Sequence, residues 1–221
     1  MTIRALLADD HQLFLDGLRA LLAKQPGIEV VAEASDGREA LSAARRLRPD
    51  VVIMDLSMPG LNGIEATRRI SKRVPSARII CLSMHTEARF VEAALEAGAA
   101  GYLPKDCASE EMTAAIRAVS KGQTYLSPGV ADVVVNVLRN RDVPARESAF
   151  DLLTDREREV LQLLAEGQST KQLAAHLALS VKTVGTHREH IMQKLGIRSI
   201  AGLTKYAIRE GLTSPEPRRE R

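Results

Sequence analysis

The chain is poor in aromatic residues and in cysteine. It has no tryptophan, and aromatic residues make up 3% of its 221 residues. Few aromatics disfavour a large aromatic-lined ligand pocket and a sheet on which nucleic-acid bases stack. The two cysteines, Cys81 and Cys107, form no CxxC pair and no metal-ligand cluster. We therefore expect a cytoplasmic protein with reduced thiols.

Long apolar runs are also missing. No stretch approaches the roughly 18 apolar residues that a membrane span needs. The apolar N-terminal run meets Asp9 and Asp10 before it is long enough for a secretory signal, and no small-residue cleavage site follows. We expect no membrane partner. Hydrophobic residues (45%) and charged residues (27%) have the proportions of a globular protein with a real core.

Charge is distributed unevenly along the chain. Residues 1–120 hold 15 Lys and Arg against 16 Asp and Glu, a net charge of −1. Residues 121–221 hold 16 against 12, a net charge of +4. Within residues 171–198, five basic residues stand against one acidic residue, Glu189. This basic C-terminal patch indicates an anionic partner such as nucleic acid.

The first 120 residues alternate short apolar runs with segments of helical period. Such alternation predicts an α/β domain over residues 1–120, with a five-stranded, doubly wound parallel sheet that helices cover on both faces. Val51–Met54 is apolar without alternation, as expected of a central strand that is buried on both sides. The five predicted strands are Ile3–Ala8, Ile28–Ala32, Val51–Met54, Arg78–Leu82 and Ala100–Leu103.

The pattern changes after residue 120. Tyr125-Leu126-Ser127 is typical of a turn, and Pro128–Leu138 is predicted to be one more helix. Residues 139–151 lack periodicity and contain a proline, which indicates a flexible linker. Residues 121–151 are therefore expected to form a linker helix and a flexible linker. The tail, residues 214–221, is rich in proline and arginine and is predicted to be disordered.

Residues 152–213 are predicted to form a second, all-α domain. Thr154 and Ser169 each open a capping box, in which a Glu or Gln stands three residues later. Ala178-Leu179-Ser180 is a tight turn between one short helix and the next, which is Val181–Leu195. Two short helices joined by such a turn form a helix-turn-helix. A further helix over Ile200–Glu210 makes this a four-helix domain.

Charged and hydroxyl side chains follow four of the predicted strands. Asp9 and Asp10 follow the first strand, Asp55 the third, Ser83 the fourth and Lys105 the fifth. Ligands of parallel sheets bind at the carboxyl ends of the strands, so these side chains are expected to meet there. Three carboxylates cannot cluster without a cation, and Mg²⁺ suits a site of few carboxylates and several waters.

This set of residues suits phosphoryl transfer to an aspartate. Asp55 is the candidate nucleophile that forms an aspartyl phosphate, while a cation, a lysine and a hydroxyl hold the phosphoryl oxygens. Taken singly, each aspartate could be a helix cap or a loop acid, but the combination favours one pocket. A phosphatase with an Asp nucleophile would need a second Asp two residues later as its general acid, and this sequence has Ser57 at that position. A flavin-binding domain would want a Ser-, Thr- or Gly-rich loop where Asp9 and Asp10 stand.

Residues 1–120 resemble the receiver domain of bacterial response regulators, which has a flavodoxin-like fold. The motifs that carry the resemblance are Leu7-Ala8-Asp9-Asp10-His11, Val52-Ile53-Met54-Asp55-Leu56-Ser57-Met58-Pro59-Gly60, Leu82-Ser83-Met84 and Gly101-Tyr102-Leu103-Pro104-Lys105. The resemblance implies that Asp55 is the phosphoacceptor. It also implies that Asp10, Asp55 and the backbone carbonyl of Ser57 bind Mg²⁺, with Asp9 contributing through water.

Three further residues take their expected roles from the resemblance. Ser83 and Tyr102 stand at the two switch positions, where the hydroxyl moves to the phosphoryl group and the aromatic ring turns inward. Lys105 completes the catalytic set. Pro104 stands where many relatives carry an aliphatic residue. An alternative for Tyr102 is simple core packing.

Residues 153–212 resemble the LuxR/FixJ type of DNA-binding domain. The matching segments are Leu153–Leu161, Leu164–Gly167, Val181–His187 and Ile191–Gly196. Together with the receiver, the domain order resembles the NarL/FixJ subfamily of response regulators. The apolar face of the last helix, Ile200–Glu210, could close the core of the domain or pair with a second copy, and the resemblance implies pairing on inverted half-sites.

Val181–Leu195 is the expected recognition helix. Its packed face should hold Val184, His187, Ile191 and Leu195, and its N-terminal half should read the major groove. Gly185 stands where relatives often carry a long polar residue, so one base contact of the family is missing here. The candidate DNA-binding residues are Lys182 and Thr186 near base edges, Thr183, Arg188 and Lys194 on phosphates, and Glu189, which could accept a hydrogen bond from cytosine.

The resulting hypothesis is a transcription regulator that phosphorylation switches. A sensor histidine kinase would phosphorylate Asp55, and the modified chain would bind promoter DNA as a homodimer, with RNA polymerase as a further candidate partner. The receiver would catalyse only its own phosphorylation and slow dephosphorylation, so the chain is not expected to be an enzyme. Two alternatives are a receiver that acts as an interaction module without phosphorylation, and an acyl-phosphate hydrolase.

Overall fold

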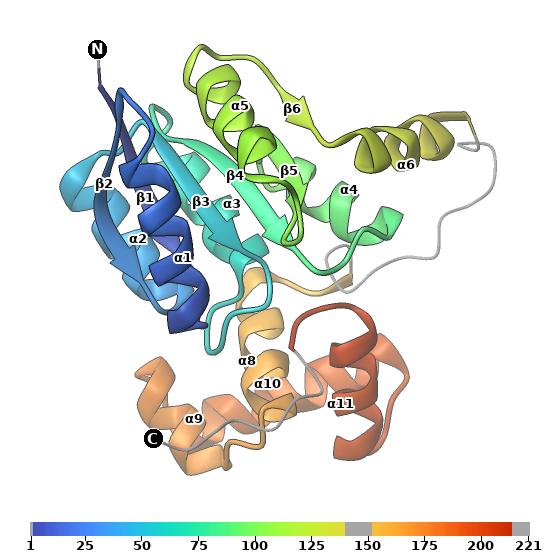
Figure 1. The fold of residues 1–221 in the computed structure, drawn as a ribbon. Coiled ribbons are helices and arrows are strands. Elements are labelled where there is room, and N and C mark those ends of the chain that lie inside the picture. The colour runs from blue at the N-terminus through green and yellow to red at the C-terminus, as the bar shows by residue number, and fades with distance from the viewer. Residues whose placement is uncertain (1, 140–151, 214–221) are drawn as a thin grey trace. The chain divides into compact units, whose positions relative to one another are not determined.

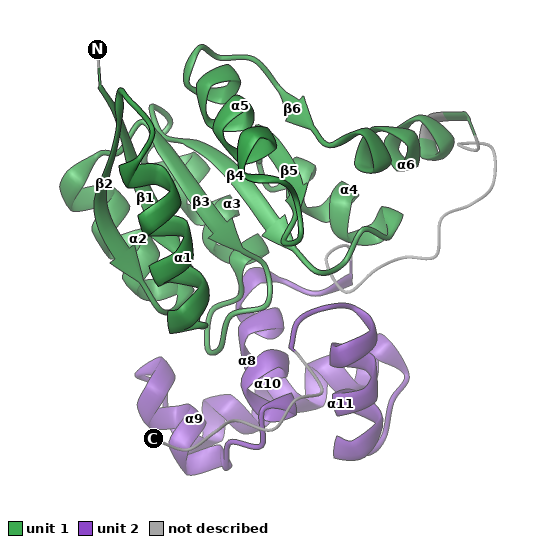
Figure 2. Ribbon diagram, in the orientation of Figure 1, with its two compact units in different colours: residues 1–144 green, residues 145–221 purple. Residues whose placement is uncertain are grey.

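The computed structural model describes residues 2–139 and 152–213. The chain divides into two compact units, residues 1–144 and residues 145–221, which are described separately (Figure 2). Except for Arg139, the predicted flexible linker lies outside the described residues, and so does the predicted disordered tail. Among the described residues, no helix is both long and apolar enough to cross a membrane.

The first unit is a parallel sheet with helices on both faces, as predicted (Figure 1). Its strands run in the order β2-β1-β3-β4-β5-β6. The strands are β1 (Ile3–Ala8), β2 (Ile28–Ala34), β3 (Val51–Asp55), β4 (Arg78–Ser83), β5 (Gly101–Pro104) and β6 (Tyr125–Leu126). The helices are α1 (Gln12–Ala23), α2 (Gly37–Leu47), α3 (Gly63–Arg73), α4 (Ala88–Glu96), α5 (Ser109–Ser120) and α6 (Pro128–Arg139).

Alternate strand residues bury themselves under different helices. Ala5 and Leu7 of β1 join a core cluster with residues of α1 and α5, which cover one face of the sheet. The next residue in β1, Leu6, is equally buried and points to the opposite face. On that face Thr67 of α3 contacts Cys81 of β4. All five residues of β3 are buried, which confirms its prediction as the central strand.

A sixth strand adds to the five that were predicted. Tyr125 and Leu126, which the sequence favoured as a turn, pair in parallel with β5. The Tyr125 amide donates to the Ala100 carbonyl at 3.0 Å, and the Ser127 amide donates to the Tyr102 carbonyl at 3.2 Å. Two residues are too few to show the alternation that marks a strand in a sequence. The helix predicted after this segment is confirmed as α6.

Close backbone packing fixes the start of α3 against the end of β3. The Gly63 amide donates to the Leu56 carbonyl at 3.0 Å, and the Asn62 side chain caps α3 by accepting from the Glu65 amide at 2.9 Å. A Cβ atom on Gly63 would lie 1.8 Å from the backbone oxygen of Asp55. Only glycine fits this approach, so the segment that follows Asp55 is held rigidly by backbone contacts.

The second unit is the predicted helical domain. In the described part its helices are α8 (Asp155–Ala165), α9 (Thr170–Leu177), α10 (Val181–Leu195) and α11 (Ile200–Arg209). Both predicted capping boxes are present, at Thr154 and at Ser169. Ala178 adopts a left-handed conformation (φ 53°) in the tight turn before α10, and Gly196 (φ 66°) ends α10. One apolar cluster joins all four helices.

Helix α8 buries charged side chains that its sequence suggests should face solvent. Arg158 is 3% exposed, and its guanidinium donates to the Leu153 carbonyl and, at 2.6 Å, to Asp155. Arg156 donates to Glu159 at 2.9 Å and to the Leu177 carbonyl at 2.6 Å. Each buried charge thus has partners, as burial of a charge requires. The bond from Arg156 to the Leu177 carbonyl ties α8 to the end of α9.

Candidate functional site

The three predicted carboxylates meet at the carboxyl end of the sheet. Possible metal-ligating atoms of Asp9, Asp10, His11 and Asp55 all lie within 4.8 Å of one another. Asp9 and Asp55 are 2% and 1% exposed, whereas Asp10 and His11 are open to solvent. The ends of β1 and β3 lie side by side, since these strands pair directly and in parallel.

Lys105 lies between two of these carboxylates. Its Nζ is 2.7 Å from Asp9 Oδ2 and 3.0 Å from Asp55 Oδ2. Burial raises the pKa of Asp55 to about 6, although Lys105 opposes this rise. Burial alone would lower the pKa of Lys105, but the charges of Asp55 and Asp9 raise it. Lys105 therefore remains protonated and offers its N–H groups to anionic oxygens in the pocket.

The donor set fits a hard divalent cation. Three carboxylates face one lysine, so the cluster carries excess negative charge, and carboxylate oxygens are the ligands that Mg²⁺ prefers. Partial burial of the Asp10 carboxylate raises its pKa, and the charge of a bound cation would lower that pKa again. Ser57 lies beside the carboxylate cluster, where its backbone amide donates a hydrogen bond to Asp55. Its carbonyl as a metal ligand stays a prediction.

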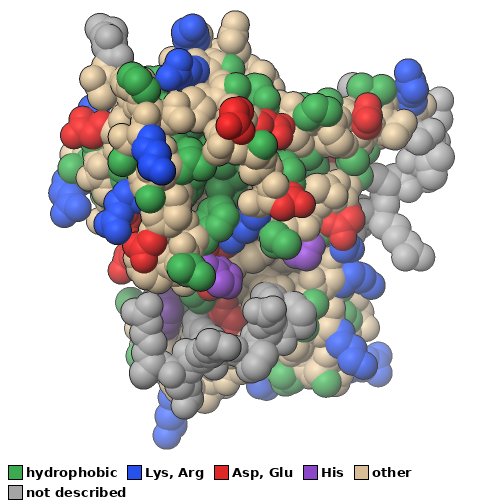
Figure 3. Space-filling model, in the orientation of Figure 1, with side chains coloured by type: hydrophobic (Ala, Val, Ile, Leu, Met, Phe, Trp, Pro, Cys, Tyr) green, Lys and Arg blue, Asp and Glu red, His purple; other side chains and the backbone are tan. Residues whose placement is uncertain are grey.

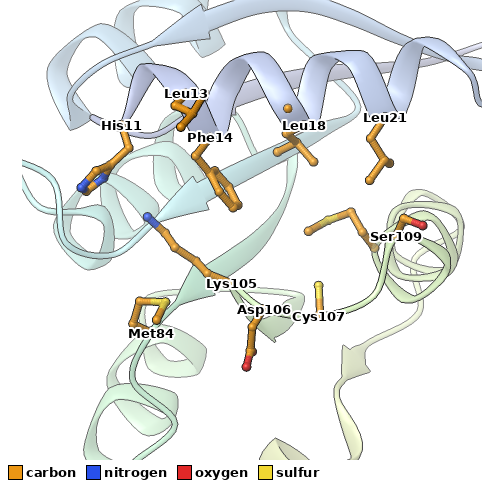
Figure 4. A pocket seen from close by; sticks show the side chains of 12 residues that line it. His11, Leu13, Phe14, Leu18, Leu21, Met84, Lys105, Asp106, Cys107 and Ser109 are labelled. Carbon is orange, nitrogen blue, oxygen red and sulfur yellow. The ribbon is translucent and has the colours of Figure 1, made fainter.

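Sequence reasoning gave no role to His11. Its Nδ1 lies 3.2 Å from Asp9 Oδ1 and 3.0 Å from Asp10 Oδ1. The signal was present in the sequence, since His11 directly follows the two aspartates. In Figure 4 the Lys105 side chain extends toward His11 and Phe14 at the start of α1. The Lys105 ammonium lies 5.1 Å from the centre of the Phe14 ring, which helps to hold it in place.

Ser83 and Tyr102 hold the segment after β4 from two sides. The Ser83 Oγ accepts from the His85 amide at 2.9 Å, and the Tyr102 hydroxyl donates to the His85 carbonyl at 2.6 Å. Both side chains belong to residues that are 0% exposed. Burial raises the pKa of Tyr102, so its hydroxyl stays protonated and serves as a donor. His85 is the common partner, which the sequence did not reveal.

An apolar groove opens beside Lys105, between α1 and the start of α5. Its cavity of about 620 Å³ is lined by residues of both helices, and Lys105 lies at its margin (Figure 4). Leu13 of α1 is 87% exposed and Met84 is 75% exposed. Figure 3 shows hydrophobic side chains gathered on the face of the first unit that carries α1 and α5. An exposed apolar patch of this kind marks a surface for a partner.

Removal of the Asp55 charge is expected to stabilise the first unit when no divalent cation is present. The folded-state pKa of Asp55 is about 6 against an ordinary 3.8, so ionisation of Asp55 costs stability as pH rises from about 4 to about 6. Asp55→Asn should therefore raise the free energy of unfolding by about 1 to 3 kcal/mol at pH 7. Urea denaturation of both proteins in a chelator would measure the difference.

The same titration provides its own control. At about pH 3 and below, Asp55 is largely protonated in both the folded and the unfolded state, so wild type and Asp55→Asn should differ little there. Saturating Mg²⁺ should stabilise wild type more than the variant, because ligand binding to the folded state shifts unfolding. Equal stability at pH 7 without a cation would contradict the assignment of a strained, buried charge to Asp55.

Helix α10 presents most of the predicted DNA-binding side chains outward. Lys182, Thr186 and Glu189 are exposed, while Thr183 and Arg188 are half-buried. The sixth candidate, Lys194, has its Nζ 2.7 Å from Glu157 Oε2 of α8. This ion pair was not foreseen, and a phosphate contact by Lys194 would compete with it.

The opposite face of α10 packs into the domain. Val184 and Ile191 are buried, as predicted, whereas His187 and Leu195 are only half-buried. No atom lies within 4 Å of the position that a Cβ on Gly185 would take, so the backbone there is uncovered. The arrangement is a helix-turn-helix in which Lys182 and Thr186, in the N-terminal half of the second helix, point away from the core of the domain.

Comparison with protein families matches both units. Residues 5–117 match the family described as response regulator receiver domain. Residues 151–207 match the family described as bacterial regulatory proteins, luxR family. The two matches cover the carboxylate site and the helix-turn-helix respectively.

Relatives and solved structures agree with this assignment. The transcriptional regulatory protein MctR of Rhizobium johnstonii is 40% identical over 96% of both chains, and the response regulator UvrY of Escherichia coli is 40% identical over 97% of both. A crystal structure of a LuxR-family two-component response regulator from an Aurantimonas species is 41% identical and covers 63% of this chain and all of its own, with a TM-score of 0.61.

A structure of RcsB from Salmonella enterica bound to a promoter in the presence of a phosphomimetic is also similar. It is 27% identical, covers 93% of this chain and 98% of its own, and has a TM-score of 0.62. The match therefore extends through both units, in the same order. The chain belongs to the two-component response regulators of the NarL/FixJ type, which join a receiver domain to a luxR-family DNA-binding domain.

Proposed function

We propose that a sensor histidine kinase phosphorylates Asp55 and that this modification controls binding of α10 to promoter DNA. The observation that carries the proposal is the contact of Lys105 with both Asp9 and Asp55 inside one carboxylate cluster. Such a cluster combines a buried nucleophile, a place for a cation and a fixed ammonium. Phosphoryl transfer needs these three elements and little else from a protein.

In the proposed step, a carboxylate oxygen of Asp55 attacks the phosphorus of a phosphohistidine. The new P–O bond forms as the P–N bond breaks, and the leaving imidazole takes up a proton. Lys105 donates hydrogen bonds to the phosphoryl oxygens, and the Ser83 hydroxyl is the second donor. Mg²⁺, when bound, supplies further neutralisation of the phosphoryl charge. The chain thus catalyses its own modification and its slow reversal.

The proposed Mg²⁺ ligands are Asp10, Asp55 and the Ser57 carbonyl, with Asp9 acting through water. The mutual proximity of the three carboxylates supports this set. His11 contributes differently, because its Nδ1 faces the Asp9 and Asp10 carboxylates that a cation would occupy. A neutral His11 can remain beside the cation, whereas a protonated one would compete with it.

The switch proposal rests on the shared partner of Ser83 and Tyr102. When the Ser83 hydroxyl turns toward a phosphoryl oxygen, its bond with the His85 amide must change. Because the Tyr102 hydroxyl holds the carbonyl of the same residue, the segment between β4 and α4 moves with it. The buried ring of Tyr102 agrees with the inward position that the family resemblance implies.

The apolar groove between α1 and α5 is the proposed docking surface for the kinase. It lies next to Lys105, so a helix that carries the phosphohistidine could seat there and reach Asp55. Exposed Leu13 and Met84 offer the apolar contacts that such a helix needs. The groove is open at the face that leads to the carboxylates.

The second proposed partner is promoter DNA, bound by a phosphorylated homodimer that cooperates with RNA polymerase. Structures of a relative, RcsB, include a complex with DNA and two dimers bound to two DNAs. In this chain Lys182 and Thr186 are placed to approach base edges, with Thr183 and Arg188 near phosphates. On α11, Ile200 is 41% exposed and offers an apolar contact to a second copy.

Lys182→Ala is expected to weaken binding to the chain's own promoter by about 1 to 3 kcal/mol and to relax preference at one base position. Lys182 is exposed near the start of α10, where such helices read bases. Fluorescence anisotropy at several salt concentrations would measure the affinity of each protein for the promoter. The exposed Lys121 of the first unit is the matched control, and Lys121→Ala should bind as wild type does. Equal affinities of both variants would exclude Lys182 from the interface.

Promoter binding by three proteins tests the proposed function as a whole. Wild type, wild type treated with a phosphodonor and Mg²⁺, and Asp55→Asn treated in the same way are compared on one promoter fragment. Phosphorylation should raise the affinity of wild type alone. If Asp55→Asn bound as tightly as phosphorylated wild type, control through Asp55 would be wrong.

A further inference from the structure

A second, basic groove lies on the first unit, away from the carboxylate site. Helices α2 and α3 pack against each other on the same face of the sheet, opposite α1 and α5 (Figure 1). Between them is a cavity of about 580 Å³. Five arginines border it, three from α2 and two from α3, together with one serine and two leucines. These residues are Arg38, Leu41, Ser42, Arg45, Arg46, Leu61, Arg69 and Arg73.

Positive charge is segregated onto these two helices. Helices α2 and α3 together hold seven basic and two acidic residues. The rest of residues 1–120 holds eight basic and fourteen acidic residues. The unit is therefore nearly neutral as a whole, while one groove has a strong positive potential. Walls of low dielectric focus such a field and raise the local concentration of anions.

Of the two carboxylates on these helices, Glu65 offsets the charge of the lining residue Arg69, and in the described part of the chain neither pairs with Arg45, Arg46 or Arg73. Glu39 accepts from the amide and hydroxyl of Ser35, outside the lining. Glu65 is buried, with Arg69 3.5 Å away and Arg68 3.9 Å away.

Three of the lining arginines, Arg45, Arg46 and Arg73, are exposed. Within residues 2–139 and 152–213, no ion pair joins Arg45, Arg46 or Arg73 to a carboxylate. Like charges that border one cavity repel, so an anion bound there would relieve the repulsion.

We propose that this arginine groove binds a compact polyphosphate anion. The planar guanidinium group presents donors in a fork that matches phosphate oxygens, and several such forks face one hollow. The lining has no aromatic side chain, so the groove would recognise a phosphate chain and not a base. The cavity has the size of small-ligand sites. A hollow suits a compact anion better than the convex phosphate row of duplex DNA.

Binding of sodium tripolyphosphate to the full chain tests this proposal by isothermal titration calorimetry without Mg²⁺. Wild type is compared with Arg45→Gln, Arg73→Gln and the double variant. Each substitution should weaken binding about tenfold, because each removes charge-assisted hydrogen bonds. Arg139→Gln on α6 is the control, since Arg139 is also exposed and forms no ion pair with a carboxylate of the described residues. Its affinity should equal that of wild type.

Further titrations identify the source of the phosphates. Adenosine triphosphate should bind about as tightly as tripolyphosphate if only the phosphate chain is read, and inorganic phosphate should bind far more weakly. Because all the substituted arginines are exposed, circular dichroism should show each variant folded.

Three results would overturn the proposal. The first is no binding of tripolyphosphate to wild type. The second is binding that the groove variants leave unchanged, which would place the anion elsewhere, for example on α10. The third is a groove whose variants weaken binding to duplex DNA but not to tripolyphosphate, which would make it an extension of the DNA-binding surface. Phosphorylation of Asp55 by a small donor serves as a separate readout, so failure here is distinct from failure of the proposed function.

Discussion

Asp55→Asn is expected to lose all phosphoryl incorporation from acetyl phosphate and Mg²⁺. An amide is a poor nucleophile, and no other carboxylate of the cluster has the same position relative to Lys105. Asp9 contacts Lys105 but follows the neighbouring strand, β1, and Asp10 is open to solvent. Wild type should gain one phosphoryl group, visible by intact-protein mass spectrometry. The variant should gain no phosphoryl group, so the ratio of incorporation between the two proteins is limited only by the detection limit of the mass spectrometer.

Asp16→Asn is the matched control for this experiment. Asp16 is an exposed aspartate on α1, and its partners among the described residues are Gln12 and Arg19 of the same helix. The Asp16→Asn protein should gain the same mass as wild type. A phosphoryl group on Asp55→Asn would show that another residue accepts it. If wild type gained no phosphoryl mass, the result would favour a receiver that acts as an interaction module without phosphorylation. DNA binding would then be measured without a phosphodonor.

Gly63→Ala is expected to destabilise the first unit by at least about 3 kcal/mol. The added Cβ would lie 1.8 Å from the Asp55 backbone oxygen and 2.8 Å from the Leu56 Cα. These are backbone atoms, so no side-chain rotation relieves the clash, and α3 must move away from β3. The movement would also break the hydrogen bond that the Gly63 amide donates to the Leu56 carbonyl. Urea denaturation would show the first unit unfolding at much lower denaturant concentration.

Gly17→Ala separates this clash from the general effect of adding a methyl group to a helix. Gly17 lies within α1, and nothing lies within 4 Å of its prospective Cβ. Alanine there should stabilise the unit by about 0.5 to 1 kcal/mol, because glycine is a poor helix former. Unfolding of the second unit should be unchanged in both variants. A Gly63→Ala protein as stable as wild type would show that the junction of β3 and α3 can yield.

The carboxylate site could be predicted from sequence because the rule that places it is topological. Parallel strands end at the same side of a sheet, so Asp9, Asp55 and Lys105 meet whatever the details of packing. Capping boxes were predictable for a similar reason, since they depend on residues three apart. These are local or topological rules, and they require no knowledge of side-chain packing.

Other features depend on contacts between distant residues. Glu157 and Lys194 are 37 residues apart, and only the packing of α8 against α10 brings them together. The burial of Arg158 likewise follows from the tertiary structure and contradicts its polar character. The arginine groove needs two helices that are adjacent in space, although each of them reads as an ordinary basic helix. The pairing of Ser83 and Tyr102 through His85 could not be inferred from spacing.

The two-residue strand β6 forms one edge of the sheet and covers the edge of β5. A strand at the margin of a sheet exposes a row of unpaired amides and carbonyls that other chains can join. Without β6, the longer strand β5 would be such a template, and Tyr102 would lie on it. With β6 in place, the margin is too short to seed intermolecular pairing. The segment after residue 120 thus protects the protein from aggregation as well as leading toward the second domain.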